Sequence, residues 1–195
     1  MIISPSYRRR LVIMVKEPRP GRVKTRLGSS IGMTTAAWWF RHQTQKILRR
    51  LYDPRWDLIL AVSPGYEGMR SRVWPSALTR IPQSQGNLGD RMKAVFKSLP
   101  PGPACIIGSD IPAITPHEIW QAFRSLGDHD ATFGPAPDGG YWLIGLKRTR
   151  PTPPHLFNDV SWSSSSALQD TIDSIPGLSI GFVTMLSDVD KIDDL

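Results

Sequence analysis

Short apolar runs alternate with longer segments of helical periodicity along this chain of 195 residues. The short runs are rich in branched residues, which is typical of buried strands. Strands are predicted at residues 11–15, 58–62, 104–107, 131–134 and 142–146, with a weaker one at 179–183. Helices are predicted at residues 33–51, 88–99, 116–126 and 165–175. This alternation indicates an α/β fold with a largely parallel sheet covered by helices on both faces, and the length fits one domain, residues 1–195.

A basic loop follows the first predicted strand, where residues 16–27 read KEPRPGRVKTRL. Two prolines and a glycine prevent the strand from continuing, and basic side chains stand at positions 19, 22, 24 and 26. In an open α/β sheet, ligands bind at the loop that leaves the carboxyl end of the first strand. The sequence therefore predicts a polyphosphate site here. Its predicted residues are Gly21, Arg22, Lys24 and Arg26.

Positive charge is concentrated in the first quarter of the chain. Residues 1–50 hold 12 Lys and Arg and one acidic residue, a net charge of +11, against 12 basic and 16 acidic residues in the remainder, a net charge of −4. This asymmetry favours an anionic ligand, and nucleic acid is an alternative that it also fits. A plain set of solvated loop charges is the simplest alternative. Residues 19–26 contain no aromatic side chain, which disfavours a nucleic-acid partner.

Missing signatures exclude several other classes of protein. A P-loop needs a glycine directly before its lysine, and Val23 stands before Lys24. The histidines show no metal-ligand spacing, and the Gly-x-Ser-x-Gly segment of a hydrolase does not occur. The single cysteine, Cys105, lies in an apolar run, so we expect a reducing compartment. No apolar run is long enough to span a membrane, and we expect a cytoplasmic protein without a membrane partner.

A second candidate site follows the predicted strand 104–107, where residues 108–112 read GSDIP. A carboxylate at the carboxyl end of a parallel strand can reach a ligand in the same crevice as the basic loop. Mg²⁺ and Mn²⁺ prefer oxygen ligands, often one or two carboxylates together with substrate phosphates. Asp110 is therefore a candidate metal ligand, with Ser109 beside it at the phosphates. A purely turn-forming role for Asp110 is an equal alternative.

A third candidate site lies between two predicted strands, where residues 134–142 read GPAPDGGYW. Asp-Gly-Gly is a strong turn signal, and a hairpin is the simplest explanation of it. Paired glycines also let a ligand approach the backbone, and Tyr141 and Trp142 can line a sugar pocket or simply pack in the core. The residues predicted for a donor or acceptor pocket are Asp138, Gly139, Gly140, Tyr141 and Trp162.

Two further segments carry weaker signals. Residues 85–92 (QGNLGDRM) lead into a predicted helix, whose N-terminus can donate N–H groups to an anion; a loop capped by Asn87 is the alternative. The phosphate-binding residues predicted there are Gln85, Gly89 and Arg91. Near the C-terminus, Asp188 and Asp190 are spaced so that they can share a cation, and a solvated acidic tail is the alternative.

In this order along nearly the whole chain, the segments resemble one family. They read K-x-P-x-P-G-x-V-K-T-R-L from residue 16, Q-G-x-L-G-x-R-M from 85, G-S-D-I-P from 108, G-P-x-x-D-G-G-Y from 134 and D-V-D from 188. This set resembles the DUF2064 family of bacterial proteins, which are commonly labelled glycosyltransferases or nucleotide-diphospho-sugar transferases. The resemblance implies a three-layer, Rossmann-like GT-A fold. The same superfamily contains guanylyltransferases of the molybdopterin and phospholactate types.

The resemblance also implies roles for residues. The nucleotide phosphates would be held by Arg22, Lys24 and Arg26. Asp110 is similar to the first metal-binding aspartate of the superfamily, and Asp188 or Asp190 to a late one. The catalytic residues would be Lys24, Asp110 and Asp138, the last facing the donor or acceptor. GT-A glycosyltransferases usually carry Asp-x-Asp where this chain reads Ser109-Asp110, which leaves nucleotidyl transfer open.

We therefore expect a metal-dependent glycosyltransferase that uses a nucleotide-diphospho-sugar donor, a small-molecule acceptor and Mg²⁺ or Mn²⁺. The first alternative is a nucleotidyltransferase of the guanylyltransferase type, which transfers a nucleoside monophosphate from a triphosphate to a phosphorylated small molecule. The second alternative is a non-catalytic protein that binds nucleic acid or another anion.

Overall fold

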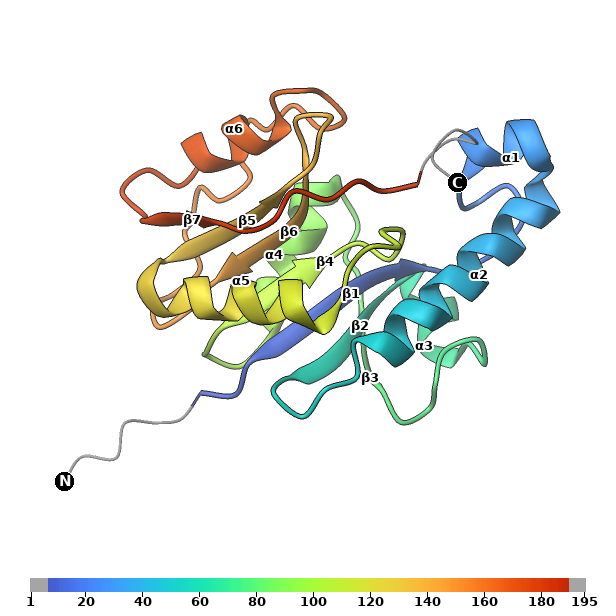
Figure 1. Ribbon diagram of the computed structural model, residues 1–195, viewed down its shortest axis with the longest axis horizontal. Helices are drawn as coiled ribbons and strands as arrows, with labels where there is room; N and C mark the ends of the chain where they lie inside the picture. Colours follow the sequence, from blue (N-terminus) through green and yellow to red (C-terminus); the bar gives the residue numbers. More distant parts are fainter. Residues whose placement is uncertain (1–6, 190–195) are drawn as a thin grey trace.

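The computed structural model describes residues 7–189. In this part of the chain, a seven-stranded sheet is surrounded by helices (Figure 1). The strands are β1 (Arg10–Lys16), β2 (Asp57–Ser63), β3 (Thr79–Pro82), β4 (Ala104–Ile107), β5 (Ala131–Pro135), β6 (Tyr141–Leu146) and β7 (Ile180–Phe182). The helices are α1 (Thr25–Ile31), α2 (Met33–Arg50), α3 (Gly65–Arg70), α4 (Leu88–Ser98), α5 (Pro116–Asp128) and α6 (Ala167–Asp173). Within residues 7–189, no helix combines the length and the apolar character needed to cross a membrane.

The strand order is β3-β2-β1-β4-β6-β5-β7. Four of the six pairings are parallel, and β6 alone runs antiparallel to its neighbours β4 and β5. The predicted α/β fold with a mostly parallel sheet is therefore confirmed. Because β6 is antiparallel to β4, it begins at the edge where β4 ends, and Ile107 pairs with Leu143. The turn between β5 and β6 is thereby carried to the carboxyl ends of β1 and β4.

Helices cover both faces of the sheet and complete three layers. Figure 1 shows α2 and α5 in front of the sheet and α4 behind it. The side chains of β1 divide between these layers, since Leu11 and Ile13 pack with α2 and α5 whereas Val12 packs with α4. Both groups are fully buried, so the central strand is apolar on both faces, as its sequence predicts.

Three elements were not predicted from the sequence. The helix α1 begins within the predicted basic loop, and its N-cap residue, Lys24, has φ of 46° and makes no side-chain capping bond, so no start signal marks it. The short helix α3 and the strand β3 were also missed. The strand β3 lies at the edge of the sheet, has four residues and ends in proline, which an edge position tolerates.

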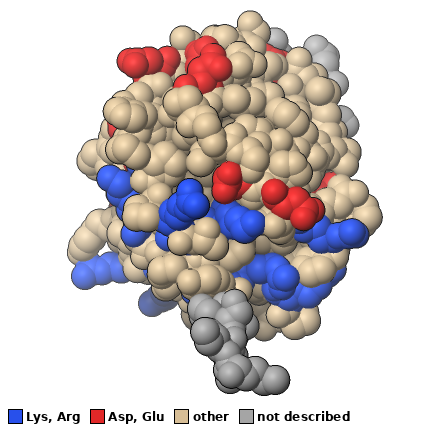
Figure 2. Space-filling model, turned by 90° about the vertical axis from the view of Figure 1, so that its left-hand side faces the viewer, with Lys and Arg blue, Asp and Glu red and all other residues tan. Residues whose placement is uncertain are grey.

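Lys and Arg also gather on the face of the molecule where β1 begins, as Figure 2 shows. Arg8 there pairs with Asp57 at 2.5 Å, and Arg10 donates hydrogen bonds to the carbonyl oxygens of Pro100 and Pro101. The positive charge of residues 1–50 is therefore not confined to the loop after β1. Part of it holds the amino end of the sheet together.

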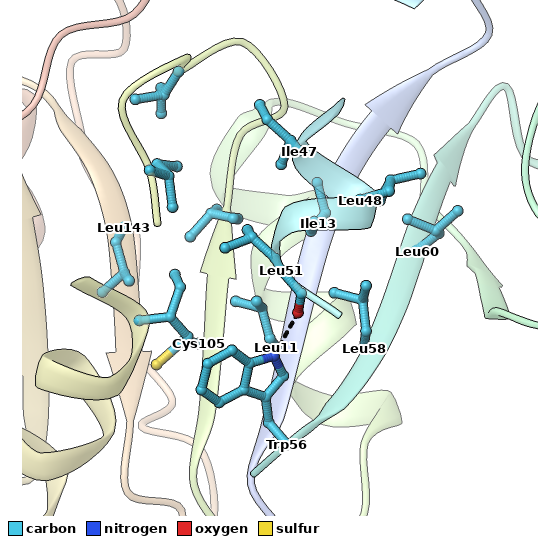
Figure 3. Close-up of a cluster of buried hydrophobic side chains, with 14 of the residues drawn as sticks. Leu11, Ile13, Ile47, Leu48, Leu51, Trp56, Leu58, Leu60, Cys105 and Leu143 are labelled. Carbon is cyan, nitrogen blue, oxygen red and sulfur yellow. Dashed lines mark hydrogen bonds between the residues drawn. The ribbon is translucent and has the colours of Figure 1, made fainter. Parts of the chain in front are cut away.

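A buried tryptophan joins α2 to the start of β2 (Figure 3). The indole Nε1 of Trp56 donates a hydrogen bond of 3.0 Å to the carbonyl oxygen of Leu51, and both residues lie in the cluster under α2 and α5. The bond satisfies the last carbonyl of the helix region in a place that water does not reach. Trp74 lies in the same cluster, but its indole nitrogen is buried and has no hydrogen-bond partner among the described residues.

These two tryptophans allow a matched test of that bond. We expect Trp56→Phe to lower the free energy of unfolding by roughly 1–2 kcal/mol more than Trp74→Phe, because only the first leaves a buried carbonyl unsatisfied. Both substitutions remove the same volume from the same core. Urea denaturation followed by circular dichroism measures the difference, and equal losses would show that the Leu51 carbonyl does not depend on Trp56.

Candidate functional site

Two adjoining hollows lie at the carboxyl ends of β1 and β4. The basic pocket, of about 520 Å³, is lined by Met14, Val15, Lys16, Arg22, Val23, Lys24, Thr25, Arg26, Phe40, Gln83, Leu88, Arg91, Gly108, Ser109 and Asp110. The acidic cavity, of about 350 Å³, is lined by several apolar side chains together with Asp110, Asp138, Gly140, Tyr141, Trp142, Trp162, Ser163, Ser164 and Asp188. Both are lined by Asp110, which therefore stands where they meet.

The basic pocket takes its charge from two parts of the fold. The loop after β1 supplies Arg22, Lys24 and Arg26, and the first turn of α4 supplies Arg91. The side chain of Ser109 is buried and lines the same pocket from the turn after β4. Such a group of lysine and arginine side chains is suited to bind phosphate oxygens.

An ion pair joins the two loops. The ammonium nitrogen of Lys24 lies 2.7 Å from a carboxylate oxygen of Asp110, and only 7% of the Lys24 side chain is exposed. Attraction between charges is much stronger at such a buried position than in water, and each charge offsets the desolvation of the other. The pair therefore fixes the basic loop against the carboxyl end of β4.

The acidic cavity combines carboxylates with aromatic walls. Asp138 lies at the tip of the hairpin between β5 and β6, and its Oδ1 accepts a hydrogen bond of 2.9 Å from the backbone N–H of Gly140. Burial raises the pKa of the Tyr141 hydroxyl, which stays protonated and accepts a hydrogen bond from Thr171 at 3.3 Å. No Lys or Arg among residues 7–189 lines this cavity.

The hairpin tip is held by close backbone packing. Gly139 has φ of +85°, and a Cβ at this position would overlap the backbone carbonyl oxygen of Ser165. Its own carbonyl oxygen accepts a hydrogen bond of 3.0 Å from the backbone N–H of Leu168, in the first turn of α6. The tip that carries Asp138 is therefore fastened to the segment that carries Ser163 and Ser164.

The carboxylates Asp110 and Asp188 come from adjoining segments, because the backbone N–H of Val189 donates to the carbonyl oxygen of Asp110 at 3.1 Å. Mg²⁺ is often held by one or two carboxylates together with substrate phosphates. Within residues 7–189, no group of three or more His, Cys, Asp or Glu could hold a metal ion unaided. This donor set therefore fits a cation that a bound phosphate helps to coordinate.

The structure brings most of the predicted site residues together. The basic pocket contains Arg22, Lys24, Arg26, Arg91 and Ser109, and the acidic cavity contains Asp138, Gly140, Tyr141, Trp162 and Asp188, with Asp110 in both. Gly21 and Gln85 are exposed and line neither hollow. Gly89 packs against Phe157 and Trp162 instead, and Asn87 caps α4 as its alternative interpretation predicts. Asp190 lies outside the described residues.

One residue of the basic pocket was missed from the sequence. Gln83 directly follows β3, and its side-chain amide donates hydrogen bonds to the carbonyl oxygens of Val15 at 3.3 Å and Ala61 at 2.7 Å. Both carbonyls lie near the carboxyl ends of the central strands, so Gln83 closes the floor of the pocket. Recognition of β3 as a strand would have placed Gln83 at this edge of the sheet.

The comparisons with known proteins agree with this architecture. A family model described as "Uncharacterized protein conserved in bacteria (DUF2064)" matches residues 47–164. A crystal structure from Desulfovibrio desulfuricans G20, of a protein provisionally named a nucleotide-diphospho-sugar transferase, is 31% identical over 95% of this chain and 84% of that chain, with a TM-score of 0.83. No curated protein matches the chain.

More distant structures share the fold alone. The inositol-1-phosphate CTP transferase of T. maritima is 13% identical over 96% of this chain and 91% of its own, with a TM-score of 0.62. The protein Rv0371c of Mycobacterium tuberculosis H37Rv, in a complex with manganese, is 13% identical over 96% of each chain, with a TM-score of 0.57.

Two glycines of nearly equal φ test the close packing of the hairpin tip on Ser165. Gly177 has φ of +84° and open space around it, so Gly177→Ala is expected to cost about 1 kcal/mol of unfolding free energy through strain alone. Gly139→Ala adds a collision with backbone, and we expect it to cost roughly 2–4 kcal/mol. Urea denaturation of both variants measures the difference. Equal losses would contradict the close packing of Gly139 on Ser165.

Proposed function

The chain belongs to the DUF2064 family, and from this premise we propose that it is a transferase acting on a nucleotide substrate, specifically a metal-dependent glycosyltransferase with a nucleotide-diphospho-sugar donor. The observation that carries the proposal is the position of Asp110 between a pocket of cations and a cavity of carboxylates and aromatic rings. A sugar nucleotide has the same division into an anionic diphosphate and a hydroxylated ring. The D. desulfuricans relative, provisionally named for such a donor, supports the same assignment.

The donor phosphates would occupy the basic pocket. Arg22, Arg26 and Arg91 line it from the loop after β1, from α1 and from α4, and each guanidinium group can contact more than one phosphate oxygen. The Lys24 ammonium adjoins the acidic cavity, since it lies against Asp110, which lines both hollows. It is therefore placed to offset charge on the phosphate that leaves the sugar.

A divalent cation, Mg²⁺ or Mn²⁺, would be held by Asp110 and Asp188 together with the donor phosphates. When bound, the ion supplies positive charge to the diphosphate leaving group. The manganese complex of the Mycobacterium tuberculosis protein with the same fold supports this cofactor.

The reaction would join an acceptor hydroxyl oxygen to the anomeric carbon of the donor sugar. The bond from that carbon to the phosphate oxygen breaks, and a nucleoside diphosphate leaves into the basic pocket. Asp138, fixed at the hairpin tip beside the cavity, would accept the proton that the acceptor hydroxyl loses. Holding the reacting groups at one junction supplies much of the rate through proximity.

Nucleotidyl transfer is the second candidate. It is favoured by the segment after β4, which reads Ser109-Asp110 where GT-A glycosyltransferases usually carry Asp-x-Asp, and in which Ser109 is buried. In this reaction a phosphate of the acceptor would attack the α-phosphorus of a nucleoside triphosphate, and pyrophosphate would leave. The T. maritima CTP transferase, which shares the fold, is named for this class of chemistry.

Thermal stabilisation by ligands distinguishes the two reactions. We would heat the wild type, Asp110→Asn and Lys24→Gln with a panel of sugar nucleotides and nucleoside triphosphates, with and without Mn²⁺. Ligand at 100 times its dissociation constant adds roughly 2.7 kcal/mol to the stability of the native state. We expect a Mn²⁺-dependent shift with a sugar nucleotide, reduced in both variants because each removes one partner of the site.

The ligand-induced shift is read against each variant's own melting temperature, because either substitution removes the ion pair and Asp110→Asn leaves the buried Lys24 charge without it. Arg124→Gln is the control for Lys24→Gln, because Arg124 carries the same positive charge as Lys24. Arg124 is exposed on α5 and lines neither hollow. A shift with triphosphates alone would favour nucleotidyl transfer. No shift with any nucleotide would overturn both reactions.

A further inference from the structure

We propose that the acidic cavity selects a neutral, hydroxyl-bearing ring and rejects a ring that carries a carboxylate or a second phosphate. The inference rests on the proposed function, since it concerns the group joined to the nucleotide phosphates. That group is the transferred sugar in glycosyl transfer, and the group newly linked to the nucleotide in nucleotidyl transfer. The same selection applies to both reactions.

The two hollows divide the charge of the site sharply. The basic pocket is lined by Lys16, Arg22, Lys24, Arg26 and Arg91, with Asp110 as its carboxylate. The acidic cavity is lined by Asp110, Asp138 and Asp188, and no basic side chain of residues 7–189 contributes to it. Anionic groups of a ligand are therefore held on one side of Asp110. Lys24 pairs with Asp110, and the proposed cation would offset Asp110 and Asp188, so an anion beyond Asp110 would meet the negative charge of Asp138.

The chemistry of the acidic cavity suits a sugar-like ring. Its volume of about 350 Å³ lies at the lower end of small-ligand pockets, roughly 300–1,000 Å³. Tyr141, Trp142 and Trp162 give it aromatic walls on which the C–H face of a ring can pack. An ionised carboxylate only accepts hydrogen bonds, so Asp138 matches ring hydroxyls, which can donate them.

Asp138 is the side chain on which the selection can be tested without disturbing the fold. Its Oδ1 accepts a hydrogen bond from the N–H of Gly140 in the hairpin turn. Gly139 packs on the backbone of Ser165, and its carbonyl oxygen accepts a hydrogen bond from the N–H of Leu168. Asparagine keeps an Oδ1 acceptor of the same shape and loses only the charge. Asp138→Asn is therefore expected to preserve the turn and to change the electrostatic potential of the cavity.

The probes are pairs of sugar nucleotides that differ by one carboxylate: UDP-glucose with UDP-glucuronate, and GDP-mannose with GDP-mannuronate. Their affinities for the whole protein with Mn²⁺ are measured by calorimetry, alongside UDP and GDP alone. We expect the acidic member of the pair that binds to be roughly 10- to 100-fold weaker in the wild type, from charge repulsion across the cavity. In Asp138→Asn the difference should fall severalfold.

Asp173→Asn is the matched control. Asp173 is exposed on α6 and lines neither hollow, so its substitution removes the same charge from the molecule without changing the cavity. The preference for the neutral sugar should stay at its wild-type value in this variant. If the preference for the neutral sugar falls equally in Asp138→Asn and Asp173→Asn, the net charge of the protein causes the selection, and the proposed role of the cavity is wrong.

The remaining outcomes separate this inference from the proposed function. Binding of UDP or GDP with equal affinities for the neutral and acidic sugars would leave the nucleotide site standing and overturn the selection. A tighter acidic sugar would overturn it as well. No binding of any nucleotide would overturn the proposed function and, with it, the inference.

Discussion

The antiparallel pairing of β6 with β4 is the constraint on which the site depends. The strand β5 ends at the same edge of the sheet as β4, and β6 returns between these two strands. Ile107 therefore pairs with Leu143, and the hairpin tip lies beside the carboxyl end of β4. Asp138 therefore arrives beside Asp110 although 28 positions separate them in the sequence. The antiparallel strand β6 thus places the β5–β6 hairpin beside the loop after β4, where both line the acidic cavity.

Much of the fold could be predicted because its signals are local. The strands at residues 11–15, 58–62 and 104–107 are short branched apolar runs, and α4 and α5 carry capping boxes at their first residues. The missed elements lack such signals. The helix α1 starts at a residue with positive φ and no capping bond, and β3 is a half-exposed edge strand with no apolar run.

The residues of the site could be predicted from the sequence better than the contacts between them. Glycines, prolines and basic residues mark the loop after β1, and Asp110 follows a buried strand, so both were placed at one edge of the sheet. The ion pair between Lys24 and Asp110 depends on the φ of 46° at Lys24 and on the adjacency of β1 and β4, neither of which composition encodes. Likewise, the role of Gly89 in packing on Trp162 becomes visible only once the loop before α6 is placed.

The Lys24–Asp110 pair also accounts for the stability, without ligands, of a site that we propose for both an anion and a cation. Two like-charged groups gathered for a ligand would repel each other in its absence. These opposite charges offset one another at 2.7 Å, with Lys24 buried and Asp110 partly exposed. In the proposed reaction, a donor phosphate and its cation would bind together. Lys24 would then exchange the Asp110 carboxylate for the phosphate, and Asp110 would exchange the Lys24 ammonium for the cation. The exchange keeps every buried charge compensated, and for that reason neither ligand alone is expected to separate the pair.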